Sequence, residues 1–523
     1  MRTLSVNRLR QKHPKAGLVP VTVAVGCVLA MVGCAGGTSA STSGEMTSLR
    51  VALGYEPMSM DLCDASSARN GMFMTENIGE PLVDVNFKTT ELEPKLATSW
   101  KQVDPNTWQF ELRQGVTFHN GAPLNAKAVA DWVNRILDPK LGCWLYGSVL
   151  DDNVKEAVAV DDDTVNITTA SPDMILPQRL AFVMIGLADG DQGKKTQKPI
   201  GTGPYKFVSY QPGAEVKVER FEKYWGKAPQ FRQVTYPIRV ESSVRSAMSA
   251  AGEVDIATMI ANQDAKAKGA VNFTVGETIY FRIDVNLPPF NDIRVRRALS
   301  LAIDRATFVK NVYGGLGEPA NAIVVPTTVG YPDDVTYPYD PAQAKALLDE
   351  ARRDGVNVGA PFKVVGWAGM RGSNGSEVPD TIVAMLKEVG FNATTQLLET
   401  ESMRNRLGSA NDPKFGPAVV LNAHGNSLGD ALVSLRGKLG CKAPQSPVCD
   451  DQLDALLKQA AETAGDHRAD LLAQAFRYEH DKLVALVPVA HMADTMIITN
   501  DRVSYTPNLA SSERLDISEV SAK

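Results

Sequence analysis

The sequence is poor in residues that build metal sites. It has six histidines and six cysteines among 523 residues, and it contains no Cys-x-x-Cys motif. No two histidines form a His-x-His or His-x-x-x-His pair, and none lies at ligand spacing from a cysteine pair. Structural zinc sites need closely spaced nitrogen and sulfur ligands of this kind. We therefore expect no metal site built by the protein alone, and no cofactor.

An apolar run long enough to span a membrane is also missing from the start of the chain. The apolar stretch 18–32 is shorter than the roughly 20 residues that a membrane helix needs. Five basic residues and no acidic one precede it, and a string of small residues follows. Basic, apolar and small-residue regions in this order are typical of a secretory signal. We expect residues 1–33 to be a signal peptide and residues 34–47 to be a flexible tether.

The cysteine after the apolar stretch indicates how the mature chain begins. Cys34 directly follows Val32-Gly33, and this ending resembles a bacterial lipobox. The resemblance implies that Cys34 carries a lipid that anchors the protein in the cell membrane, facing away from the cytoplasm. The alternatives are an ordinary signal peptide with an incidental cysteine, or an uncleaved anchor.

The chain has no excess of positive charge. Its formal net charge is −6, and removing the five basic residues of the signal leaves −11. An acidic balance provides no basic surface for nucleic acid or anionic lipid. We therefore expect no nucleic-acid partner, and we expect lipid rather than charge to hold the protein at the membrane.

Four cysteines remain for disulfides in an oxidising compartment: Cys63, Cys143, Cys441 and Cys449. Four cysteines allow three pairings. Cys441 and Cys449 bracket a short loop that contains two prolines, so we expect this pair to close it. Elimination then leaves Cys63 with Cys143.

Periodicity predicts a mixed α/β protein of at least two lobes. The mature chain exceeds the roughly 250–300 residues that one core usually holds. Helices are expected after the capping residues Asn125, Asp292 and Asp340, and over residues 378–389. Strand-like runs occupy 49–53, 107–112, 216–220 and 363–367. We find no repeat of fixed period and no heptad run.

Five blocks of sequence, in a fixed order, resemble the peptide/nickel/opine group of ABC-importer solute-binding proteins. They lie at residues 93–100, 107–121, 199–205, 224–229 and 286–299. Each block is weak by itself, but five in order are a specific signal that covers roughly residues 48–500. Most of their residues are expected to be scaffold. We expect Gly201 and Gly203 to supply positive φ angles.

The resemblance implies a bilobal, periplasmic-binding-protein-like clamshell with mixed sheets, of the large peptide-binding type. Lobe one is expected at residues 48–285, with an extra subdomain at about 86–198, and is completed by 486–523. Lobe two is expected at 286–485. The chain would cross between the lobes near Val285 and near Val487-Pro488.

A glycine-rich loop at residues 368–375 is the first candidate ligand contact. It stands between a predicted strand and the helix that begins near residue 378, and free N–H groups at such a turn suit an anion. Arg371 adds a planar guanidinium that can pair with a carboxylate. In dipeptide-binding relatives an arginine in this loop holds the peptide carboxylate. A surface arginine without ligand is the alternative.

The second candidate is the loop at residues 421–430. Peptide-binding relatives usually have a tryptophan here, followed by an aspartate that pairs with the peptide amine. This chain has Asn422 and Gly425 near those places. Its neutral polar residues suit a sugar, an opine, a modified peptide or a nickel chelate as well as a peptide; they are Asn422, His424, Asn426 and Ser427.

Residues 425–429 also match the Gly-x-Ser-x-Gly nucleophile elbow, which makes a secreted serine hydrolase the alternative from another class. Ser427 would be its nucleophile. Asp450 or Asp451 and one of the later histidines (His467, His480 or His491) would complete a triad. The motif is short and occurs by chance, and the five blocks are not hydrolase blocks.

The sequence thus predicts a binding protein rather than an enzyme. We expect a monomeric, lipid-anchored receptor that captures a peptide or peptide-like solute by lobe closure and delivers it to ABC permease subunits. A nickel-chelate, opine or sugar binder of the same group is the alternative ligand class.

Overall fold

The computed structural model describes residues 47–65, 71–86, 91–187, 193–367, 376–426, 428–499, 501–507 and 515–523. Residues Met46–Lys523 form one compact unit. The predicted signal peptide, Cys34 and most of the tether lie outside the described residues. Within the described part, no helix has both the length and the apolar character to cross a bilayer.

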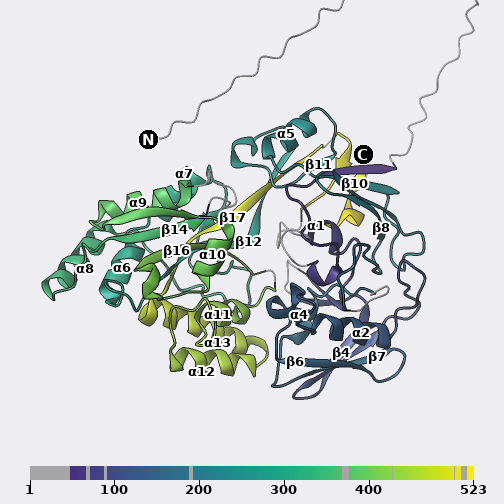
Figure 1. Ribbon diagram of the computed structural model, residues 1–523, viewed down its shortest axis with the longest axis horizontal. Helices are drawn as coiled ribbons and strands as arrows, with labels where there is room; N and C mark the ends of the chain where they lie inside the picture. Colours follow the sequence, from purple (N-terminus) through teal and green to yellow (C-terminus); the bar gives the residue numbers. More distant parts are fainter. Residues whose placement is uncertain are drawn as a thin grey trace, which may run out of the picture. The chain divides into compact units, whose positions relative to one another are not determined.

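The central feature is an 11-stranded sheet that combines parallel and antiparallel pairs (Figure 1). Two strands at its centre, β12 and β17, are the longest and pair antiparallel. A short strand, β13 (Glu318–Pro319), also pairs with β17. In sheet order the other ten strands are β15 (Ala393–Leu398), β14 (Phe362–Trp367), β16 (Ala418–Gly425), β12 (Ala270–Ile283), β17 (Leu486–Ile498), β11 (Ile256–Ala257), β1 (Ser48–Ala52), β10 (Gln233–Pro237), β9 (Glu215–Arg220) and β8 (Tyr205–Gln211).

Three smaller sheets and a set of helices complete the described fold. A four-stranded antiparallel sheet has the order β4 (Ala97–Asp104), β5 (Thr107–Leu112), β7 (Thr164–Thr169) and β6 (Val154–Ala159). The two-stranded sheets are β2 (Val83–Val85) with β3 (Leu92–Pro94), and β18 (Val503–Ser504) with β19 (Ser521–Ala522). The α-helices are α1 (Gly71–Met74), α2 (Ala126–Ile136), α3 (Leu145–Ser148), α4 (Leu176–Leu180), α5 (Ser242–Ala250), α6 (Ile293–Leu301), α7 (Arg305–Val312), α8 (Pro341–Arg353), α9 (Glu377–Glu388), α10 (Thr400–Leu407), α11 (Ala431–Leu439), α12 (Asp451–Ala461) and α13 (Gly465–Tyr478).

The helix starts predicted from capping residues are confirmed. The side chains of Asn125, Asp292 and Asp340 accept hydrogen bonds from the first-turn N–H groups of α2, α6 and α8. These contacts satisfy donors that have no partner inside the helix. The four strand-like runs correspond to β1, β5, β9 and β14, within one residue at each end.

Two disulfides join the predicted cysteine pairs. Cys63 bonds to Cys143 and Cys441 bonds to Cys449. The first bridge lies beside a buried ion pair between Asp61 and Arg135, whose nitrogen and oxygen atoms are 2.7 Å apart. It therefore fixes the segment after β1 against the C-terminal end of α2.

A buried carboxylate shows how three of the five blocks act as scaffold. Glu80 is fully buried and accepts hydrogen bonds from the Thr202 hydroxyl (2.8 Å), the Tyr224 hydroxyl (2.8 Å) and the Trp225 indole N–H (2.9 Å). The Lys95 ammonium lies 3.9 Å from it. Burial raises the pKa of Glu80, and these partners oppose that rise. Residues of three blocks thus converge on one acidic side chain.

The roles expected for Gly201 and Gly203 were wrong in their physical reason. Neither residue is among the glycines with positive φ. Instead, a Cβ atom at Gly201 would lie 2.0 Å from the Ile78 carbonyl oxygen, and one at Gly203 would lie 2.5 Å from the Asn77 oxygen. Both glycines are needed because the backbone passes directly against the segment that precedes Glu80.

Candidate functional site

The strand order defines a switch point in the parallel part of the large sheet. β14 pairs parallel with β15 on one side and with β16 on the other. The chain passes from β14 through α9 to β15, and later returns to place β16 on the opposite side of β14. In open α/β sheets, ligands bind outside the carboxyl ends of the strands where the direction of winding reverses. The candidate site therefore lies where β14 ends at Trp367 and β16 ends at Gly425.

The first predicted ligand loop, 368–375, follows β14. The second was expected at 421–430, but residues 421–425 are the end of strand β16, and only the residues after Gly425 follow it. Arg371 comes after β14, and Ser427 comes after β16. Arg371 and Ser427 themselves lie outside the described residues, so their roles stay predictions. Asn422 and His424 belong to β16, and Asn426 follows it directly.

Asn422 and His424 lie on one face of β16, and both of them and Asn426 form hydrogen bonds with the protein itself. Side chains two residues apart in a strand point to the same face. The Asn422 amide donates to the Tyr280 hydroxyl at 3.0 Å. His424 Nε2 lies 2.7 Å from Ser434 Oγ of α11, and the Asn426 amide donates to the same oxygen at 2.8 Å. Burial holds the pKa of His424 well below its usual value, so the ring is neutral at physiological pH.

The acidic residue at the end of the 421–430 segment caps a helix. Asp430 accepts a hydrogen bond from the Leu432 N–H at the start of α11. It also forms a two-pronged, buried ion pair with Arg468 of α13, at 2.9 and 3.0 Å. Its carboxylate is therefore already paired with a cation inside the protein.

One glutamate that sequence patterns did not indicate lies at the same edge. Glu277 of β12 is directly opposite Gly425, the last residue of β16. Its side chain is partly exposed. Glu277 therefore provides a carboxylate at the switch point, where the 421–430 loop itself offers only neutral side chains and a capped Asp430.

The triad considered for a hydrolase does not assemble among the described residues. Asp450 caps α12 and accepts a hydrogen bond from the Tyr478 hydroxyl at 3.1 Å. His480 pairs with Asp481, and His491 contacts Thr278. Among the residues that the structure describes, no hydrogen bond joins Asp450 or Asp451 to any of the three histidines His467, His480 and His491. The described part of the chain also contains no group of three histidine, cysteine or acidic side chains that could hold a metal ion.

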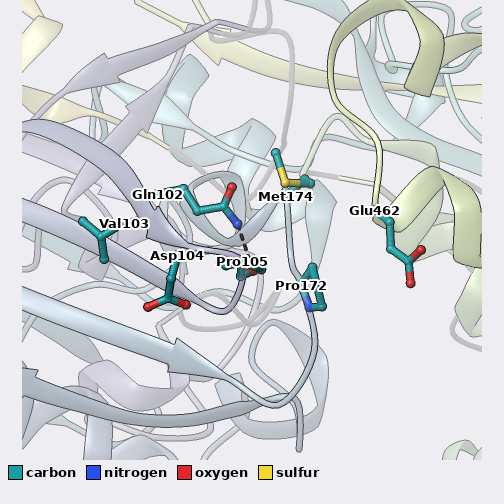
Figure 2. Close-up of a pocket in the computed structure, with 7 residues that line it drawn as sticks. All are labelled: Gln102, Val103, Asp104, Pro105, Pro172, Met174 and Glu462. Atoms are coloured by element: carbon teal, nitrogen blue, oxygen red, sulfur yellow. Dashed lines mark hydrogen bonds between the residues drawn. The ribbon is translucent and has the colours of Figure 1, made fainter.

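A pocket elsewhere lacks the features of a solute site. It is lined by Gln102, Val103, Asp104, Pro105, Pro172, Met174 and Glu462 (Figure 2). The Gln102 amide already donates to the Pro105 carbonyl at 2.9 Å. Solute sites combine an apolar lining with several convergent polar groups. Here Asp104 and Glu462 are the only charged groups, and both are acidic.

His491 gives this region a pH dependence. The residue is 2% exposed, its Nδ1 lies 2.8 Å from the Thr278 hydroxyl, and burial lowers its pKa to about 4. In the unfolded chain, the His491 ring takes up a proton near pH 6.5. Its contribution to the free energy of unfolding is therefore complete above that pH and is lost as the pH falls toward 4. We expect the lowered pKa of His491 to reduce the free energy of unfolding by about 1.4 kcal/mol at pH 5.5, relative to pH 7.5. Urea unfolding at pH 7.5 and 5.5 measures this.

A glutamine at position 491 removes one titrating group and should reduce the loss of unfolding free energy between pH 7.5 and 5.5 by about 1.4 kcal/mol. The matched control is His467→Gln, because His467 is exposed. This variant should lose as much unfolding free energy between pH 7.5 and 5.5 as wild type does. An equal change in unfolding free energy between pH 7.5 and 5.5 for wild type and His491→Gln would contradict the role given to His491.

Comparison with known proteins identifies the family. Residues 91–443 match the family model described as bacterial extracellular solute-binding proteins, family 5 Middle. The chain belongs to this family. The family 5 assignment confirms the resemblance predicted from the five blocks, and with it the bilobal α/β fold class.

Individual family 5 relatives agree with the assignment. The dipeptide-binding protein of Escherichia coli K12 is 30% identical over 459 residues, covering 78% of this chain and 83% of that protein. The di/tripeptide-binding protein 2 of Pseudomonas aeruginosa is 27% identical over 440 residues, covering 76% and 81%. The solved structure of the ABC transporter substrate-binding protein CtaP from Listeria monocytogenes has a TM-score of 0.79 at 23% identity, covering 91% and 99%.

Proposed function

We propose that this family 5 protein is the extracytoplasmic substrate-binding component of an ABC importer for peptides or peptide-like solutes. The observation that carries the proposal is the similarity to the E. coli dipeptide-binding protein over 83% of that protein. The switch point at β14 and β16 supports it, because one predicted ligand segment follows β14 and the other begins in the last residues of β16. ABC permease subunits would receive the solute, and the protein itself would carry out no catalysis.

We further propose two lobes that close on the solute, with lobe one at 48–285 and 486–523 and lobe two at 286–485. The large sheet supports this division. Strands β12 and β17 lie between the β11-β1-β10-β9-β8 side and the β16-β14-β15 side. Among the described strands, only β12 and β17 could connect the two proposed lobes near Val285 and Val487. Closure would exclude water and strengthen polar contacts to the solute.

Mass spectrometry of solutes released from the native protein tests the ligand class. Protein purified from its own host is denatured, and the released small molecules are identified. We expect peptides of a few residues. Recovery of an opine, a sugar or a nickel chelate instead would contradict the peptide assignment while leaving the receptor role in place.

A lipid on Cys34 is part of the proposal. Cys34→Ala should release the protein from membrane fractions or leave it unprocessed, because no thiol remains to carry the lipid. Cys27→Ala is the matched control, since Cys27 lies in the segment expected to be removed. Fractionation followed by intact-mass measurement checks both variants. A processed Cys34→Ala protein that stays fully in the membrane fraction would overturn the anchor.

A further inference from the structure

The pocket of Figure 2 is a groove that three distant segments build together. Val103 and Pro105 come from the turn between β4 and β5, Pro172 and Met174 come from the segment between β7 and α4, and Glu462 stands at the end of α12. The groove shares no residue with β14, β16 or the segments that follow them. The first two segments belong to the proposed extra subdomain of lobe one, and α12 belongs to the proposed lobe two. The groove therefore crosses the proposed division between the lobes.

The lining of the groove is largely apolar and reaches the surface. Val103 is 45% exposed, and Pro172 and Met174 are partly exposed. The rings of Pro105 and Pro172 fix the backbone on two sides, so the groove is formed before a partner arrives, and this lowers the entropic cost of binding. Methionine adapts its shape to a neighbour and is enriched at protein interfaces. These side chains suit the apolar part of a protein segment.

The two charged groups of the groove are both negative and carry no counter-ion. Asp104 accepts the Asn106 N–H at 2.8 Å, and no ion pair joins Asp104 or Glu462 to a lysine or arginine in the described part of the chain. Glu462 is the C-cap residue of α12. The C-terminal end of a helix carries partial negative charge, so a carboxylate there does not stabilise the helix. Two carboxylates and this helix end together favour a cation in the groove.

We propose that this groove binds a segment of the ABC permease that presents a lysine or arginine beside apolar side chains. This inference rests on the proposed importer function. The positive group would lie between Asp104 and Glu462, which flank Pro105, Pro172 and Met174 in Figure 2. The apolar neighbours of that group would pack on the two prolines and the methionine. The charge of −11 on the mature chain favours the approach of a basic surface.

The position of the groove couples docking to the arrangement of the lobes. Because both proposed lobes line it, its width changes when they move. A partner that fits one width better shifts the lobes toward that arrangement, by as much as its affinities for the two arrangements differ. The coupling is reciprocal, so a bound solute changes the affinity for the permease by the same factor. The extra subdomain would supply two of the three walls that the permease contacts.

Photocrosslinking in living cells identifies the partner. The full-length protein carries Glu462→benzoylphenylalanine and is expressed in host cells that lack the native copy. After irradiation, crosslinked products are purified from detergent-solubilised membranes and identified by mass spectrometry. We expect a product that contains an integral-membrane permease subunit. The matched control is Gln452→benzoylphenylalanine, because Gln452 is exposed at the opposite end of α12. It should give at least tenfold less of this product.

Charge reversal tests whether the groove is needed for transport. The combined variant Asp104→Lys and Glu462→Lys should lower uptake of isotope-labelled dipeptides by these cells at least tenfold, because like charges placed together weaken an interface by more than a factor of ten. The purified variant should keep the dipeptide affinity of wild type within about twofold, since the groove lies outside the switch point. Glu388→Lys is the matched control, because Glu388 is exposed and also stands at the end of a helix, α9. Thermal unfolding shows that each variant is folded.

The outcomes separate the groove from the importer function. If wild type neither binds dipeptides nor supports their uptake, the peptide importer function fails, and the docking groove fails with it. If wild type transports dipeptides but the charge-reversed variant does so equally well, or position 462 crosslinks no permease subunit, the importer function stands and the docking groove is overturned. A loss of uptake with an equal loss of dipeptide affinity would assign the two acids to solute binding and would also overturn it.

Discussion

Replacing Asp430 with alanine is expected to lower the free energy of unfolding by about 3–5 kcal/mol, the largest stability effect we predict. The substitution leaves the Arg468 guanidinium buried without its carboxylate, because both side chains are 5% exposed. It also removes the cap of α11. An unpaired buried charge costs several kcal/mol since it has lost both water and its partner. Urea unfolding at pH 7.5 measures the change.

The same helix offers a matched control for this experiment. Arg477, also in α13, pairs with Asp334 at 2.7 Å, but these side chains are 42% and 60% exposed. Exposed ion pairs contribute roughly 0–1 kcal/mol. Asp334→Ala should therefore change stability by less than 1 kcal/mol. Similar losses for Asp430→Ala and Asp334→Ala would show that burial does not set the strength of the first pair.

Arg371→Ala is expected to weaken peptide binding by about tenfold to a few hundredfold. A charge-assisted hydrogen bond contributes roughly 1.5–3 kcal/mol, and each 1.4 kcal/mol corresponds to a factor of ten. An unpaired carboxylate in a closed, water-poor site adds to the loss. Arg371→Lys should also bind more weakly, because an ammonium cannot form the planar, two-pronged contact. Calorimetric titration with the peptides recovered from the native protein measures both variants.

The control for Arg371 is another arginine of the same part of the chain. Arg353, at the end of α8, is exposed, and its replacement by alanine should leave affinity unchanged. The melting temperature of the solute-free Arg371→Ala protein should barely change, because a loop arginine supports little packing. Unchanged affinity in Arg371→Ala would point to a solute without a carboxylate.

Local signals account for the parts of the fold that the sequence predicted well. A capping side chain acts on N–H groups two or three residues away, so Asn125, Asp292 and Asp340 could be identified from their immediate neighbours. The short loop between Cys441 and Cys449 indicated its own disulfide for the same reason. The family blocks then supplied the bilobal fold class, which local patterns alone did not determine.

Contacts between distant segments account for what sequence reasoning missed. Glu80 meets Thr202, Tyr224 and Trp225 from more than 120 residues away, so no pattern around Glu80 indicates that it is buried. Glu277 lies opposite Gly425 because β12 and β16, which are far apart in the sequence, pair antiparallel in the large sheet. The glycine at 425 was visible in the sequence, but the strand that pairs with it was not.

A bulge in β12, where its pairing with β17 shifts register, has a mechanical consequence. A ladder of hydrogen bonds resists bending, and the resistance is least where the ladder is interrupted, between Thr274 and Thr278. If the proposed lobes rotate, β12 should flex at residues 275–277, and the amide protons there should exchange with solvent faster than those of the flanking ladder. Glu277 belongs to this compliant stretch.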